Sequence, residues 1–124
     1  MASTIGDIEI RSLSGDSTTD GKQIDIAATS SPGTILHTAV AGTSYWDYIT
    51  IEVSNRDTVA RTVTIEWGGT TAADTVTLEL APGLGPVTMI DRRMLRDSHV
   101  VRAYCEAANV VSAWGEVHRA RIEV

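Results

Sequence analysis

The sequence is poor in several residues whose presence would point to a particular kind of protein. It has no Phe and only one Cys, Cys105, among 124 residues. A lone cysteine cannot form an intrachain disulfide, so the fold does not depend on an oxidising compartment. Without Phe, a core must be built from aliphatic side chains with a few Trp and Tyr anchors. Residues 1–10 contain neither a cationic start nor an apolar run, so we expect no signal peptide and no membrane span.

Positive charge is scarce as well. Ten basic residues face sixteen acidic ones, which gives a formal net charge of -6. Nucleic acids and anionic membrane surfaces attract basic faces, so we expect neither as a partner. Lys22 is the only lysine. Arginine is favoured over lysine at protein interfaces, although a GC-rich genome produces the same bias.

What the chain has in abundance is alternation of apolar and polar side chains. Val, Ile and Thr make up about a third of the residues, a composition that suits strands. Residues 48–80 read as three strands joined by two polar turns, with Thr and Glu between the apolar positions. A side-chain period of two predicts one face in the core and one in water. The apolar positions are Ile49, Ile51, Val53, Val63, Ile65, Trp67, Val76, Leu78 and Leu80.

Further strands are predicted before and after this stretch. The earlier ones cover residues 22–29 and 34–40, the first strand of the stretch itself begins at residue 45 and ends at 53, and the later ones cover 87–90, 100–106 and 110–124. Asp91 can cap one short helical turn at residues 92–96. Apolar residues change parity within the last strand, which predicts a β-bulge at Gly115. About eight or nine short strands favour an all-β, antiparallel β-sandwich that is jelly-roll-like or immunoglobulin-like.

The N-terminal residues differ in composition from the rest. Residues 1–21 are rich in Ser, Thr, Gly and Asp, which is typical of a flexible N-terminal arm or a loosely attached edge strand. Residues 22–124 then form a single β-sandwich domain. Ile5, Ile8 and Ile10 are the firm apolar points of the arm. We predict that they bind a partner, for example by adding a strand to a neighbouring sheet.

Metal sites are weakly supported. Asp16, Thr18, Asp20 and Gly21 match the opening of a calcium loop, but Ala27 stands where a bidentate Glu is required. A polar loop before a strand is the simpler interpretation, and calcium there stays open. The three histidines have no metal-ligand spacing, and the sequence predicts no cofactor. They are His37, His99 and His118, and His118 is interpreted as a histidine at the edge of the core.

Catalytic signatures are missing from the sequence too. Glu52, Glu66 and Glu79 fall at water-facing positions of neighbouring strands, where a solvated sheet face explains them better than an acid–base pair. Cys105 is interpreted as buried and inert, and no Ser lies in a nucleophile motif. The sequence therefore predicts a protein that is not an enzyme.

Three aromatic residues stand out by their parity. Trp46 and Tyr48 alternate out of phase with Ile49, and Trp114 is out of phase with Val111 and with its neighbour Ala113. They should point away from the core. Exposed aromatics near arginines are typical interface anchors. We therefore predict that these three residues bind a partner, unless an edge of the same domain covers them.

Two stretches carry a resemblance. The run IEVSNRDTVARTVTIEWGGTTAADTVTLELAPGLGP, followed by VVRAYCEAANVVSAWGEVHRARI, resembles small virion structural proteins of tailed bacteriophages. The shared pattern is an Asn-x-Asp turn, an Arg-Thr-Val-Thr-Ile strand ending in Trp-Gly-Gly, a Pro-Gly-rich connector and a closing Ala-Asn-Val-Val pair. It covers about residues 45–124.

The resemblance implies a virion protein made in the host cytoplasm without a signal peptide. Such proteins are β-sandwiches that decorate or cement the capsid, and they have no active site. The implied partners are the major capsid protein or neighbouring virion proteins, and a homo-oligomer is implied, with a trimer as the first guess by analogy. Two alternatives stay open. One is a tail, head–tail joint or host-binding fibre component, and the other is a carbohydrate-binding module that stacks sugars on Trp46, Tyr48 or Trp114.

Overall fold

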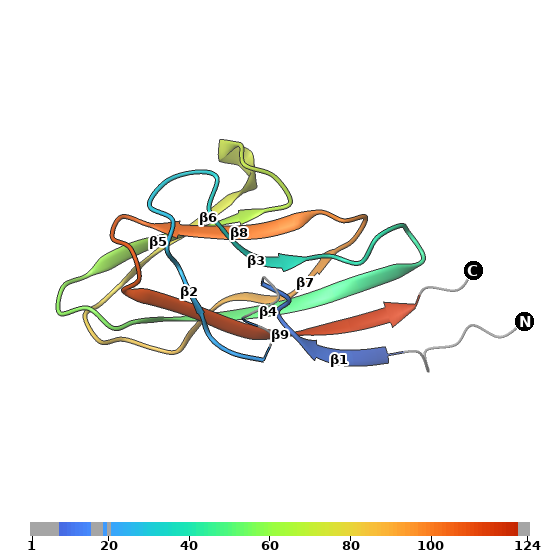
Figure 1. Ribbon diagram of the computed structural model, residues 1–124, viewed down its shortest axis with the longest axis horizontal. Helices are drawn as coiled ribbons and strands as arrows, with labels where there is room; N and C mark the ends of the chain where they lie inside the picture. The colour runs from blue at the N-terminus through green and yellow to red at the C-terminus, as the bar shows by residue number, and fades with distance from the viewer. Residues whose placement is uncertain (1–7, 16–18, 20, 122–124) are drawn as a thin grey trace, which may run out of the picture.

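The fold is an all-β sandwich of two antiparallel sheets (Figure 1). The computed structural model describes residues 8–15, 19 and 21–121. Within them lie nine strands and one 3-10 turn, η1. In chain order these are β1 (Ile8–Ser12), β2 (Ile24–Asp25), β3 (Thr34–Thr38), β4 (Tyr45–Asn55), β5 (Arg61–Trp67), η1 (Ala72–Asp74), β6 (Thr75–Leu80), β7 (Val87–Leu95), β8 (Val100–Cys105) and β9 (Val111–Arg121).

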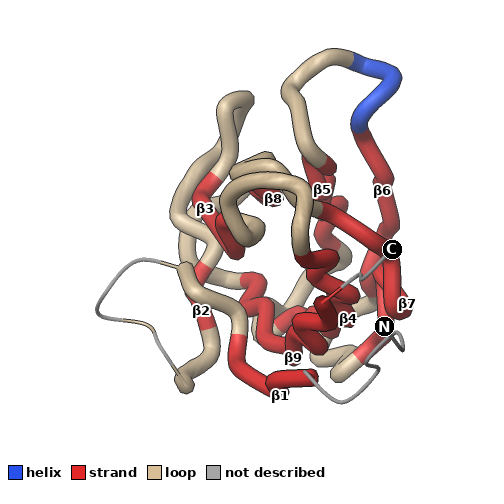
Figure 2. Tube along the Cα trace, turned by 90° about the vertical axis from the view of Figure 1, so that its right-hand side faces the viewer, coloured by secondary structure: helices blue, strands red, loops and turns tan. Residues whose placement is uncertain are grey.

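The strand order identifies the sandwich as a jelly roll. One sheet has the order β1-β9-β4-β7, with β2 also paired to β9, and the other has the order β3-β8-β5-β6. The pairs β5–β6, β4–β7, β3–β8 and β1–β9 are nested in the sequence. Nested pairs of this kind form a single two-stranded antiparallel ribbon. When the ribbon wraps around the core, β4 also pairs with β9, and β5 also pairs with β8. Figure 2 shows the two layers, with β3 and β8 above β9 and β1.

The core lies between the sheets and is aliphatic, as predicted. Strands β4, β5, β8 and β9 each contribute alternate side chains that are fully buried. Cys105 belongs to this set as a free, buried thiol. The members with no exposed surface include Ile49, Ile51, Val53, Val63, Ile65, Val101, Ala103, Cys105, Val111, Ala113 and Val117. The single core cluster runs from Leu13 to Val117, so both sheets share it.

The predicted helical turn at residues 92–96 is wrong. β7 continues to Leu95, and its residues Arg93 and Met94 pair with Ile49 and Tyr48 of β4. The register shifts before that point, and Arg92 takes a positive φ of 52° there. Pairing with β4 therefore outweighs the helical preference of this segment, and irregularities at two register shifts absorb the two extra residues of β7.

The predicted bulge at Gly115 is also wrong. The β4–β9 register runs without a shift from Tyr45 opposite Arg121 to Asn55 opposite Val111. Gly115 instead permits a close approach of the two strands, because a Cβ added there would overlap the carbonyl oxygen of Thr50. The change of parity in the sequence rests on Ala120, which lies on the side of β9 away from the core, and on Ile122 and Val124, which lie outside the described residues.

The N-terminal segments are more closely tied to the sandwich than their composition suggested. Residues 8–12 of the expected arm pair with β9 as an edge strand, and Leu13 is only 2% exposed. The predicted strand at residues 22–29 is shorter, because the chain pairs with β9 at β2 and then crosses to the other sheet. There the Cys105 N–H donates to Ala28 O at 3.1 Å. Ile24 and Ile26 are buried as predicted.

Candidate functional site: the outer face of the five-stranded sheet

The strand register brings most of the predicted binding residues onto one surface. Ile8 and Trp46 lie on either side of Ala120, and Ile10 and Tyr48 lie on either side of His118. Residues directly opposite each other in antiparallel strands share a face. Trp114 lies opposite Glu52 on that same face. We call this surface the outer face of the five-stranded sheet, since the alternate residues of β4 and β9 fill the core. Ile5 lies outside the described residues.

The outer face exposes large apolar groups. Ile10 is 69% exposed, Ile8 47% and Trp114 39%. Met94 pairs with Tyr48, so it joins the same row, and it is 41% exposed. Isolated exposed apolar side chains need no explanation, whereas here they gather on one face, over β1, β9 and β7.

Trp46 is held in place by an arginine. The guanidinium carbon of Arg96 lies 3.9 Å from the centre of the Trp46 ring, which is a cation–π contact. Arg96 is itself fixed, because its Nη1 donates a hydrogen bond to the backbone oxygen of Thr43 at 3.0 Å. The indole is therefore half-buried and oriented before any partner arrives, which lowers the entropic cost of binding.

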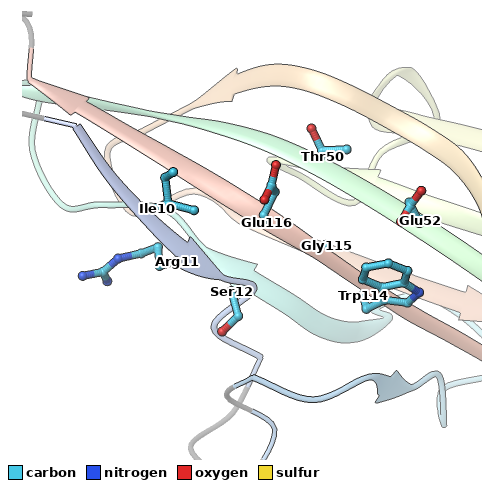
Figure 3. A pocket seen from close by; sticks show the side chains of 8 residues that line it. All are labelled: Ile10, Arg11, Ser12, Thr50, Glu52, Trp114, Gly115 and Glu116. Carbon is cyan, nitrogen blue, oxygen red and sulfur yellow. The ribbon is translucent and has the colours of Figure 1, made fainter.

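A shallow groove of about 590 Å³ crosses the other end of the outer face. Figure 3 shows Trp114 and Glu116 on β9 beside Thr50 and Glu52 on β4. His118 Nε2 and Glu116 Oε1 form a hydrogen bond at 3.1 Å, so His118 lies on the outer face rather than at the core edge that was predicted for it. The groove combines an aromatic ring with two carboxylates, two hydroxyls and a guanidinium. It is lined by Ile10, Arg11, Ser12, Thr50, Glu52, Trp114, Gly115 and Glu116.

The strongest polar cluster lies inside the sandwich, and the sequence analysis missed it. Asp47 of β4 is fully buried and lies between His37 of β3 and Arg119 of β9. His37 Nε2 donates to Asp47 Oδ2 at 2.8 Å, and Arg119 Nε donates to Oδ1 at 2.7 Å. His37 Nδ1 accepts the Ser14 N–H at 3.0 Å, which places the ring hydrogen on Nε2. The cluster joins the two sheets.

The electrostatics of the cluster follow from this geometry. Burial raises the pKa of Asp47, but the hydrogen bonds from His37 and Arg119 and the charge of Arg119 outweigh it and bring the pKa to about 2. The pKa of Arg119 is raised in turn, mainly by its hydrogen bond to Asp47. A signal for the pair was present in the sequence: Asp47 and Arg119 have the parity of the core residues in their strands.

Glu66 corrects a second prediction. It was expected to face water, yet it is 1% exposed. Its carboxylate accepts hydrogen bonds from Gly33 N, at 2.7 Å, and from the Ser31 hydroxyl. The loop before β3 therefore folds over the far face of the four-stranded sheet at this point. The period of a strand cannot predict that a loop covers one of its residues, because the loop comes from a distant part of the sequence.

The geometry of the two buried clusters, one at Asp47 and one at Glu66, supports no catalytic or binding chemistry. Both nitrogens of His37 are occupied by partners inside the protein, and His37 and Asp47 have no exposed surface. Across residues 8–15, 19 and 21–121 no group of three His, Cys, Asp or Glu side chains could hold a metal ion. Most of the candidate calcium loop, including Asp16, Thr18 and Asp20, lies outside the described residues.

Comparison with known proteins found no matching protein family, no matching curated protein and no matching solved structure. In the part of the chain that the structure describes, no helix is long and apolar enough to cross a membrane.

Proposed function

We propose that this protein is a non-enzymatic structural protein of a tailed-bacteriophage virion, a capsid decoration or cement protein that binds the lattice of the major capsid protein. The proposal rests on the resemblance of residues 45–124 to small virion proteins and on the chemistry of the outer face. The observation that carries it is the row formed by Ile8 and Ile10 of β1 and by Trp46 and Tyr48 of β4, on either side of β9.

The composition of this row favours a protein partner. Tyr and Trp are the residues that most often dominate binding energy at protein interfaces. The isoleucines beside them offer only apolar surface, which a protein partner can desolvate. The strands beneath are anchored in the core, because every second residue of β4 from Asp47 to Asn55 is buried. A sheet anchored in this way suits attachment to a regular shell.

The first test is the copy number of the chain in purified particles, measured by mass spectrometry against the major capsid protein. A fixed ratio with hundreds of copies is expected of a decoration protein. Absence from the particle would overturn the virion assignment.

The second test is co-sedimentation of the purified chain with particles that lack it. Met94→Asp should weaken binding about tenfold or more, because it places a charge on the outer face beside Tyr48, at the β7 end of the row. Val59→Asp is the matched control, since Val59 is similarly exposed, at 47%, but lies in the β4–β5 loop. Equal binding by the two variants would contradict the assignment of the outer face.

A position elsewhere in the virion is the alternative that shares this chemistry. A tail, head–tail joint or host-binding fibre component would use the same apolar row. The copy number separates the cases, because a ring or a tip needs only a handful of chains.

The groove at Trp114 favours a different candidate function, carbohydrate binding. An exposed indole can stack on a sugar ring, and the carboxylates of Glu52 and Glu116 can accept hydrogen bonds from its hydroxyls. A panel of oligosaccharides should then shift the tryptophan fluorescence of the parent chain but not of Trp114→Ala. No shift with any sugar would remove this candidate.

A further inference from the structure

The five-stranded sheet ends at the edge strand β1. β1 pairs with β9 on one side, and no described strand lies beyond residues 8–11 on the other. Natural sheets protect such edges with bulges or charges that spoil pairing. Of the edge strands, β3 and β7 carry register shifts, whereas β1 and β6 pair with their neighbours in a regular register.

The sequence of β1 is complementary to itself. Consider a second copy of the chain related by a two-fold axis at Ile10. Antiparallel pairing then sets Ile10 opposite Ile10 of the second copy, and Glu9 opposite Arg11 in both directions. Opposite charges that face each other across strands stabilise a sheet.

Other registers are disfavoured by the same residues. A shift of two residues would place Glu9 opposite Glu9, or Arg11 opposite Arg11, and like charges destabilise the pair. After a shift of one residue, the outer faces of the two copies would lie on opposite sides of the joined sheet. The alternation of Glu9, Ile10 and Arg11 therefore selects one register.

The isolated chain leaves these side chains largely in water. Ile10 is 69% exposed. Arg11 Nη2 and Glu9 Oε1 form an ion pair at 2.8 Å, but their side chains are 46% and 58% exposed. Pairing would give each charge a second opposite charge and would cover part of both Ile10 side chains.

We propose that two copies of the chain associate through β1 about a two-fold axis at Ile10, which joins their five-stranded sheets into one continuous sheet. The partner is a second copy of this chain, because the charge pattern is complementary to itself. This inference does not depend on the virion assignment. Its consequence is that the outer faces of the two copies lie side by side.

A disulfide trap tests the register directly. In Ile10→Cys the two thiols would be opposite each other, with Cα atoms roughly 4.5–5.5 Å apart, which a disulfide can span. Ile8→Cys is the matched control, because its two thiols would be separated by four residues, or about 13 Å. The native Cys105 is buried, so it should form no disulfide in this assay.

Under mild oxidation, Ile10→Cys should give a covalent dimer on a non-reducing gel much faster than Ile8→Cys. Equal rates, or no dimer from Ile10→Cys, would overturn the proposal. Circular dichroism of both variants verifies that each one folds.

A charge exchange provides an independent test by sedimentation equilibrium. The parent chain should shift from 13.3 kDa toward twice that mass as its concentration rises. Arg11→Glu alone and Glu9→Lys alone should each weaken association by about tenfold or more, because each places like charges opposite each other. A mixture of the two variants should associate again, since the lysine introduced in one chain would then face the glutamate introduced in the other.

The mixture experiment distinguishes a variant that has lost only its association from a variant that has lost its fold. A chain that stays monomeric up to about 1 mM, where even small interfaces associate, would overturn the proposal. So would a trimer, or a mixture that associates no better than its components.

Discussion

Asp47→Asn should be strongly destabilising, although it replaces a single oxygen by an amide nitrogen. The carboxylate is fully buried. It accepts four hydrogen bonds, from His37 Nε2 at 2.8 Å, Val40 N at 3.1 Å, and Arg119 Nε and Nη2 at 2.7 and 3.0 Å. An amide has one acceptor oxygen, so its NH₂ group must face donors whichever way it turns. Arg119, whose side chain is only 17% exposed, also loses its counter-charge.

The structure sets the magnitude in two ways. The pKa of Asp47 falls from 3.8 to about 2, and at 1.36 kcal/mol per pKa unit this difference corresponds to about 2 kcal/mol of stability for the ionised form. Removing one member of a buried ion pair costs more, about 3–5 kcal/mol, because the remaining charge stays buried without a partner. We expect the larger value for Asp47→Asn.

The pH dependence has a definite sign. A carboxyl group whose pKa is lowered by folding stabilises the protein above its unfolded pKa, and this contribution is lost as the pH falls through the folded pKa. For Asp47 the loss should occur between about pH 4 and pH 2. The Asn variant should lack this part of the acid transition, since it has no proton to bind there.

Urea denaturation at pH 7 and at steps down to pH 2 measures both effects. Asp91→Asn is the control, because Asp91 is exposed on β7 and its substitution should change stability by less than about 0.5 kcal/mol. If Asp47→Asn unfolds within about 1 kcal/mol of the parent, and the two pH profiles run parallel, the cluster does not hold the sheets together as argued.

Three further predictions concern single positions on β9, β5 and β8. Gly115→Ala should cost about 3 kcal/mol or more in denaturation experiments, because its Cβ would overlap Thr50 O; a loss under about 1 kcal/mol would show that the strands can separate there. Glu66→Ala should cost about 1–3 kcal/mol, since Gly33 N and the Ser31 hydroxyl lose their acceptor, and limited proteolysis should then cut the loop before β3 faster than in the parent. Cys105 should react with a thiol reagent only as the protein unfolds, so rapid labelling in native buffer would contradict its burial.

The sequence predicts what depends on neighbouring residues. Alternation in β4 correctly separated the core residues Ile49 and Ile51 from the outer-face residues Trp46 and Tyr48, because the period of two is local. The strand count and the antiparallel sandwich followed from the same signal. The helical turn at residues 92–96 failed because a local preference competed with pairing to β4, which only the fold reveals.

Contacts between distant segments were beyond this kind of prediction. The buried cluster forms only when the two sheets pack together, because β3 and β9 belong to different sheets. Its members are His37, Asp47 and Arg119. Glu66 has an outward parity, and a loop from another part of the chain covers it. The choice between a jelly roll and an immunoglobulin-like order likewise depends on which strands pair, and strand count carries no information on that.

The buried cluster and the outer face are linked through register. Trp46 and Asp47 are adjacent in β4, so one points outward and the other into the core. A slip of one residue would bury Trp46 and expose Asp47. A core that is only aliphatic would tolerate such a slip better than one in which a carboxylate must meet His37 and Arg119, because a misplaced buried charge is penalised heavily. We infer that the cluster contributes less to net stability than to fixing the β4–β9 register, which keeps Trp46 and Tyr48 in line with Ile8 and Ile10.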